Sequence, residues 1–123
     1  MKLFRFALAA AILVSASPAL AMDVATFLVR ADKLQKKGPL ALFSSEYRLL
    51  KREAEGAGAQ LKAENAALVK AGKRRPYCPP KKGSLSSSEL LSGFRAIPAA
   101  ERPRTSVKDG MRIYLAKKWP CRR

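Results

Sequence analysis

The sequence predicts an all-α protein: a small helical domain with a long amphipathic helix and a C-terminal helical hairpin closed by one disulfide. After residue 22, apolar residues recur at steps of three and four, the spacing that gathers side chains on one face of an α-helix. In addition, the only two cysteines, Cys78 and Cys121, stand at the two ends of the C-terminal third. We therefore interpret that third as two short helices whose outer ends are joined by a disulfide.

Residues 1–21 have the features of a secretory signal peptide. Lys2 and Arg5 form a cationic leader, residues 6–14 are all apolar, and the segment up to Ala21 ends in the small-x-small pattern that signal peptidase accepts. A membrane anchor is the alternative, but nine apolar residues fall well short of the roughly 20 that a spanning helix requires. We expect cleavage after Ala21, a single helical domain over residues 22–123, and a periplasmic or secreted protein.

The first helix is expected after Asp23, which can cap it, and before Gly38-Pro39, which should end it. Its apolar face consists of Val24, Phe27, Leu28, Ala31 and Leu34.

The long helix follows a short apolar connection and is capped by Ser44 or Ser45. Its apolar residues alternate steps of four and three, and Glu64 interrupts them where an apolar residue is due. Gly56 and Gly58 each cost about 1 kcal/mol in a helix interior, so a bend or break is an alternative to the plain helix packing that we favour. Gly72 should end the helix. The apolar series is Phe43, Tyr47, Leu50, Ala54, Ala57, Leu61 and Leu68.

The disulfide-closed segment begins with the extended Cys78-Pro79-Pro80. Ser86 and Glu89 then form a capping box, and Leu85 and Leu90 occupy the positions of a hydrophobic staple. The apolar face of the helix that they start consists of Leu90, Leu91, Phe94 and Ile97.

The second helix of the hairpin follows Pro98, is capped by Thr105 or Ser106, and ends at Pro120. Its apolar face consists of Val107, Met111, Tyr114, Leu115 and, as the weakest member, Trp119. We expect the long helix and the hairpin to share one core. Its predicted members are Phe43, Tyr47, Leu50, Leu61, Phe94, Ile97, Met111, Tyr114 and Leu115.

Two cysteines in an exported chain usually pair, and here only one pairing exists. On the chain-entropy model, closing the loop of 44 residues from Cys78 through Cys121 stabilises the fold by roughly 4 kcal/mol. The alternative, a reactive thiol, is disfavoured because the chain has no histidine to activate it and no Cys-x-x-Cys motif.

The charge balance favours an anionic partner. Lys2 and Arg5 are the only charged residues of the first 21, so residues 22–123 carry 23 basic and nine acidic residues, a net charge of +14. Such a surface raises encounter rates with anions. Nucleic acid is the usual partner of a basic domain, but an exported protein rarely meets it. We therefore expect an acidic protein or an anionic envelope component, and the sequence leaves open whether the chain forms a homodimer.

A basic window without any acidic residue extends from Ala66 to Ser88. The disulfide would bring Arg122 and Arg123 beside the first half of this basic window. A solvated linker without a partner is an equal alternative, because charge runs are common in loops. The candidate partner-binding residues are Lys73, Arg74, Arg75, Lys81, Lys82, Arg122 and Arg123.

The residue types that most catalytic sites need are missing or scattered. Without histidine, Ser-His-Asp and Cys-His arrangements are excluded, and two cysteines cannot close a structural zinc site alone. We therefore expect no enzyme activity, no cofactor and no metal. The classes that remain are a binding protein of the envelope, a basic module that holds anionic lipid or polysaccharide, and a periplasmic chaperone with an exposed apolar groove.

The order of motifs in the C-terminal third resembles a known family. Tyr77-Cys78-Pro79, an amphipathic helix, Pro98, a second helix and Trp119-Pro120-Cys121 are similar to the C-terminal half of the Rap/Tai immunity proteins over about 45 residues. The resemblance implies a small, exported, disulfide-bonded helical protein that binds and inhibits peptidoglycan amidases delivered by type VI secretion. It also implies the Cys78–Cys121 pairing, and it assigns no inhibitory residue in this chain.

Overall fold

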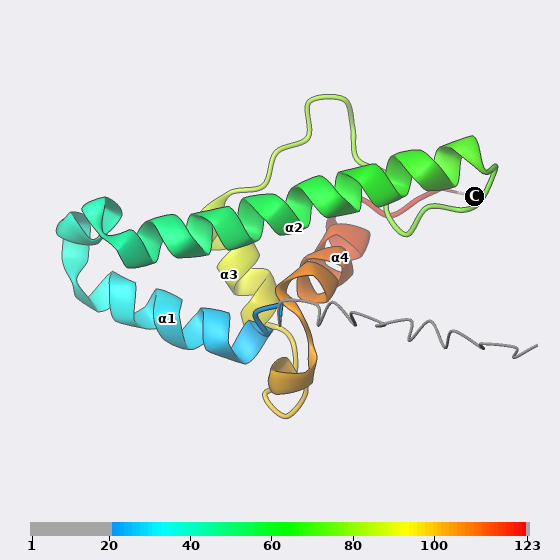
Figure 1. Cartoon of the computed structure of the whole chain (residues 1–123). Helices are drawn as coiled ribbons and strands as arrows, with labels where there is room; N and C mark the ends of the chain where they lie inside the picture. Colours follow the sequence, from blue (N-terminus) through cyan, green and yellow to red (C-terminus); the bar gives the residue numbers. More distant parts are fainter. Residues whose placement is uncertain (1–20, 123) are drawn as a thin grey trace, which may run out of the picture.

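The computed structural model describes residues 21–122, so the predicted signal peptide, apart from Ala21, and Arg123 lie outside the described residues. The described chain is helical and contains no strand, which confirms the predicted all-α class (Figure 1). One isolated antiparallel bridge joins Asp23 to Ser106. The elements are α1 (Val24–Lys36), the 3-10 helix η1 (Gly38–Phe43), α2 (Ser45–Lys70), α3 (Ser87–Arg95), the 3-10 helix η2 (Arg102–Arg104) and α4 (Val107–Lys118).

The long helix α2 spans the molecule, and the other helices pack along one side of it (Figure 1). α1 lies below α2, and the chain turns from α1 into α2 at the η1 corner, while α4 packs against the C-terminal half of α2. α3 packs against both α1 and α4. The hairpin and the N-terminal helix therefore share α2 as a common support.

Each α-helix begins with a side-chain cap. The oxygens of Asp23, Ser44, Ser86 and Ser106 accept hydrogen bonds from the backbone N–H three residues later, at 2.8, 3.1, 3.2 and 3.0 Å. Each bond satisfies a donor that the first helical turn leaves unpaired. The predicted caps are confirmed, with Ser44 rather than Ser45 and Ser106 rather than Thr105 in this role.

Two glycines in the left-handed region end the first two helices as predicted. Gly38, with φ of 72°, follows α1, and Gly72, with φ of 66°, follows α2. The N–H of Gly72 donates to the carbonyl of Val69 at 3.1 Å, and the N–H of Lys73 donates to that of Leu68 at 2.9 Å. This pair of bonds is the Schellman pattern, which satisfies the last carbonyls of a helix. α2 itself is one unbroken helix through its interior glycines.

The core lies between the four α-helices, and Phe94 is at its centre with no exposed surface. Phe94 meets Phe27 edge to face, with ring centroids 5.4 Å apart. Buried residues of α2, α3 and α4 belong to the same cluster as the apolar face of α1. Six predicted core residues are buried: Leu50, Leu61, Phe94, Ile97, Met111 and Leu115.

Three predicted core residues differ from expectation. Phe43 is 79% exposed, because it ends η1 before the Ser44 cap and so does not share the face of α2. Tyr47 and Tyr114 are only half-buried. Tyr114 covers Gly93, where an added Cβ would lie 2.6 Å from the Tyr114 ring. Prediction also missed Tyr77, which is buried.

The predicted disulfide is present between Cys78 and Cys121, whose Cα atoms lie 4.9 Å apart. Beside it, the N–H of Cys78 donates to the carbonyl of Trp119 at 2.8 Å. The amide of Asn65, on α2, donates to the carbonyl of Tyr77 at 3.2 Å. The bridge therefore ties the outer ends of the hairpin together and holds them against α2.

Candidate functional site

The described residues form an apolar groove of about 670 Å³. α1 and η1 form one wall and the N-terminal half of α2 forms the other, while the start of α3 and Met111 of α4 close the inner end. We call this feature the groove. The buried apolar residues of its walls include Phe27, Ala31, Leu34, Ala41, Leu50 and Leu90.

Apolar side chains that the packing of the helices leaves partly exposed border the groove. Leu85 and Leu91 are only half-buried at its inner end, as is Tyr47 on α2. Ala54 and Gly58 also line it, and their small side chains leave space between the helices that a larger residue would fill. A volume in the range of ligand pockets, with predominantly apolar walls, is typical of a binding site.

The polar residues around the groove offer little chemistry. Lys51 and Glu55 form a pair four residues apart at 3.8 Å, with both side chains more than half exposed. Ser86 and Ser87 lie where α3 begins. Among residues 21–122 there is no cluster of three His, Cys, Asp or Glu side chains that could hold a metal. The arrangement can therefore exclude water from an apolar group and orient it.

Sequence reasoning named such a groove only as part of the chaperone alternative and assigned no residue to it. Two small residues of α2 were the available signal: Ala54, which belongs to the predicted apolar series, and Gly58. The sequence predicts plain helix packing at Gly58. In the structure, an added Cβ at Gly58 would meet only Met111 Sδ, at 3.8 Å.

The candidate partner-binding residues of the described chain lie on both sides of Cys78 and directly after Cys121. Lys73 and Arg74 are exposed, Arg75 is half-buried, and the carbonyl oxygen of Arg75 lies 3.5 Å from Cys121 Sγ. The exposed Arg122 follows Cys121, so the C-terminus lies beside the segment that follows α2 (Figure 1). We call Lys73, Arg74, Arg75 and Arg122 the basic end.

Lys81 and Lys82 follow the disulfide-bonded Cys78 by three and four residues. They occupy a turn in which the N–H of Gly83 donates to the carbonyl of Pro80 at 3.0 Å. This turn belongs to the loop before α3 (Figure 1), and an added Cβ at Gly83 would lie 2.9 Å from the ring of Trp119. The disulfide therefore joins the basic window to the segment that carries Arg122.

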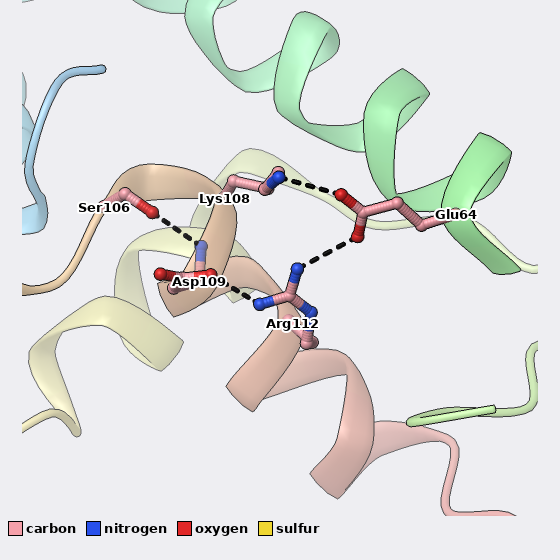
Figure 2. Close-up of polar contacts among 5 residues, drawn as sticks. All are labelled: Glu64, Ser106, Lys108, Asp109 and Arg112. Atoms are coloured by element: carbon pink, nitrogen blue, oxygen red, sulfur yellow. Dashed lines mark hydrogen bonds and ion pairs between the residues drawn. The ribbon is translucent and has the colours of Figure 1, made fainter. Parts of the chain in front are cut away.

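The acidic residues of the described chain are largely occupied, which leaves the surface strongly cationic. Six of the nine form ion pairs within 4 Å. The most extensive set joins α2 to α4: Lys108 Nζ donates to Glu64 at 2.8 Å, and Arg112 donates to Glu64 at 3.0 Å and to Asp109 (Figure 2). Hydrogen bonds from Lys108 and then Arg112 lower the pKa of Glu64. Anionic partners therefore meet few competing carboxylates.

The disulfide bears on the location of the protein. The disulfide is typical of a protein that folds outside the cytoplasm. None of the helices among residues 21–122 combines the length and apolar character needed to cross a bilayer.

Comparison of the chain with family models, with curated proteins and with solved structures found no match.

Proposed function

We propose that this protein is a binding protein of the bacterial envelope and that the groove takes an apolar segment of an acidic protein partner. The observation that carries the proposal is the groove itself, whose walls are core helices and whose lining is apolar. Open apolar surface of this kind gains roughly 25 cal/mol per Å² when a partner covers it. Recognition would be of the helix-in-groove type, in which a partner helix buries its apolar face.

The charge of the surface supports an acidic partner over a neutral one. Residues 22–123 have a net charge of +14, and most of their acids are already paired within the chain. Complementary charge raises association rates and disfavours basic competitors. Binding in this account has an apolar centre in the groove and an electrostatic contribution that salt weakens.

The finer proposal concerns the class of partner and the compartment. The resemblance of residues 77–121 to the Rap/Tai proteins supports a secreted cell-wall amidase as the partner, which the bound protein would inhibit. Export by the signal peptide of residues 1–21 would place it in the periplasm, and the disulfide supports that compartment.

The basic end favours a second candidate, a module that holds an anionic polymer of the envelope. Lys73, Arg74 and Arg122 are exposed, and the contact of 3.5 Å between the Arg75 carbonyl oxygen and Cys121 Sγ places the segment after α2 beside the C-terminal segment. Replacing Lys73, Arg74 and Arg75 by glutamine tests this candidate. Retention on purified cell wall should then weaken and lose much of its salt dependence, whereas unchanged retention would reduce these residues to solubilising charge.

Site-specific photo-crosslinking tests the groove. A benzoylphenylalanine at position 47 or 91 places the photophore in the groove, and one at position 113 places it on an exposed site of α4 outside the groove. We expect one discrete acidic protein to be cross-linked in envelope extract from the two groove positions and not from the control. The cross-linked protein, once purified, must then bind to the parent protein, and its activity must be inhibited if it is an amidase. The same adducts from all three positions, or none from the groove, would contradict the proposal.

A further inference from the structure

The corner between α1 and α2 exposes three large apolar side chains, of which Leu42 also lines the groove, whereas Leu40 and Phe43 do not. Leu40 and Phe43 are each 79% exposed and Leu42 is 57% exposed, whereas Ala41 between them is buried. We call Leu40, Leu42 and Phe43 the apolar corner. It lies at the end of the molecule where η1 joins the two helices, away from α4 and the C-terminus (Figure 1).

The backbone holds the apolar corner in this exposed position. The left-handed Gly38 and the adjacent Pro39 turn the chain out of α1. At the other end, the Ser44 hydroxyl donates to the carbonyl of Ala41 at 2.6 Å and accepts from the N–H of Tyr47 at 3.1 Å. Because both ends are fixed and Ala41 is anchored in the core, the three side chains cannot collapse onto the protein without breaking these contacts.

Cations flank the apolar corner on both sides. Lys33, Lys36 and Lys37 precede it at the end of α1, and Arg48 follows it in the first turns of α2. Within the described chain, none of these four residues has an ion pair within 4 Å. The acid of the first turn of α2, Glu46, already pairs with Arg30 at 3.6 Å.

We propose that the apolar corner docks on an anionic phospholipid bilayer, with its three side chains in the boundary between headgroups and acyl chains. The flanking cations then lie at the level of the lipid phosphates. Protruding apolar side chains surrounded by cations suit a bilayer, because a fluid surface accepts them without a matching pocket. An acidic protein would need a concave apolar site of complementary shape. This proposal does not rest on the proposed function of the groove, and it is tested at Leu40 and Phe43, which do not line the groove.

Co-sedimentation with vesicles tests the docking. The oxidised protein, residues 22–123, is mixed with vesicles of equal parts phosphatidylglycerol and phosphatidylcholine, or with phosphatidylcholine alone. We expect binding to the anionic vesicles that weakens with salt and little binding to the neutral ones. In the variant L40S/F43S, partitioning should fall about tenfold or more, since two large apolar side chains no longer enter the bilayer.

Matched controls distinguish the effect of the apolar corner on vesicle binding from the effect of exposed apolar or charged residues elsewhere. V69S/I113S removes two exposed apolar residues elsewhere, at 58% and 44% exposure, and should leave partitioning unchanged. K36Q/K37Q should weaken it by roughly 25-fold, about fivefold for each cation, while K81Q/K82Q should have a much smaller effect. All the replaced residues are exposed, so circular dichroism should show the same fold for every variant.

Two results would overturn the docking proposal. The first is equal partitioning of L40S/F43S and the parent protein, or equal binding to neutral vesicles. The second is a dimer in analytical ultracentrifugation that L40S/F43S abolishes, without vesicle binding by the parent protein, since the corner would then be an interface between two copies of the chain. Neither result bears on partner capture by the groove.

Discussion

Glu64 of α2 accepts a hydrogen bond from Lys108 of α4 at 2.8 Å, although the two residues lie 44 positions apart in the sequence. Arg112, one turn further along α4, donates to the other carboxylate oxygen at 3.0 Å (Figure 2). Glu64 occupies a position at which the apolar series of α2 would place an apolar residue. At this turn α2 and α4 are therefore joined by ion pairs, whereas a neighbouring turn would join them by apolar packing. Both partners are about two-thirds buried, which reduces solvent screening of the pair.

We predict that Glu64→Gln lowers the free energy of unfolding by about 1 kcal/mol, because a partly exposed carboxylate loses two charged donors. Urea denaturation measures the change. Glu55→Gln is the matched control on the same helix, since Glu55 has only the exposed Lys51 as a partner at 3.8 Å, and it should cost less than about 0.5 kcal/mol. Equal effects of the two variants would mean that the network between α2 and α4 does not stabilise the fold.

Stability should fall in acid, because three carboxylates have a lowered pKa in the folded protein. Lys108 and Arg112 lower the pKa of Glu64 from 4.5, Lys118 lowers that of Glu89, and the backbone N–H of Thr26 lowers that of Asp23 from 3.8. A lowered folded-state pKa contributes stability that is complete above the unfolded-state value and lost as the pH falls through the folded one. We expect a plateau from pH 7 to about 5 and a steep loss below about 4.5.

Thermal denaturation across this pH range measures the effect, and Glu64→Gln should flatten the acid limb. A melting temperature that stays constant down to pH 3 would contradict the assigned pKa shifts.

The disulfide should contribute a large part of the stability. Replacing Cys121 by serine is expected to lower the free energy of unfolding by roughly 2 to 5 kcal/mol, because the denatured chain regains the freedom of a long loop. Mass spectrometry without reductant should first show that the parent protein has no free thiol. An unchanged melting temperature in the variant would show that the bridge adds no stability.

Two glycines in helices should respond to alanine in opposite directions. At Gly110 an added Cβ would lie 2.7 Å from Val24 Cγ2 and 3.1 Å from the Phe94 ring, so Gly110→Ala should destabilise the fold by about 1 to 3 kcal/mol. At Gly56 nothing lies within 4 Å, so Gly56→Ala should stabilise it by about 0.5 to 1 kcal/mol. Chemical denaturation of the pair checks both signs, and a destabilising Gly56→Ala would show that α2 needs that glycine.

The features that sequence reasoning predicted well are local. The caps at Asp23 and Ser86 depend on hydrogen bonds across three residues, and the apolar face of α1 depends only on the helical period. Phe43 was misplaced because the apolar spacing extends back past the Ser44 cap to Phe43, whereas α2 begins only at Ser45. A period alone does not show that the backbone changes from a 3-10 to an α-helix at that point.

The candidate site was harder to predict, because it depends on how the helices pack. The groove results from the incomplete closure of α1 on α2, which neither helical face specifies alone. The burial of Tyr77 depends on its place against α2, where Asn65 donates to its carbonyl.

The affinity of two alanine-to-glutamate variants for the partner identified by cross-linking tests the central claim most directly. Ala54→Glu places a carboxylate in the groove, whereas Ala63→Glu makes the same change on the exposed side of α2. Isothermal titration calorimetry, with circular dichroism to show that both variants fold, should give at least tenfold weaker binding for Ala54→Glu, because a charge then has to be desolvated against an apolar segment. Ala63→Glu should bind within about twofold of the parent protein, since an exposed charge far from the contact has little effect. Equal affinity of Ala54→Glu and Ala63→Glu would contradict the assignment of the groove as the binding site.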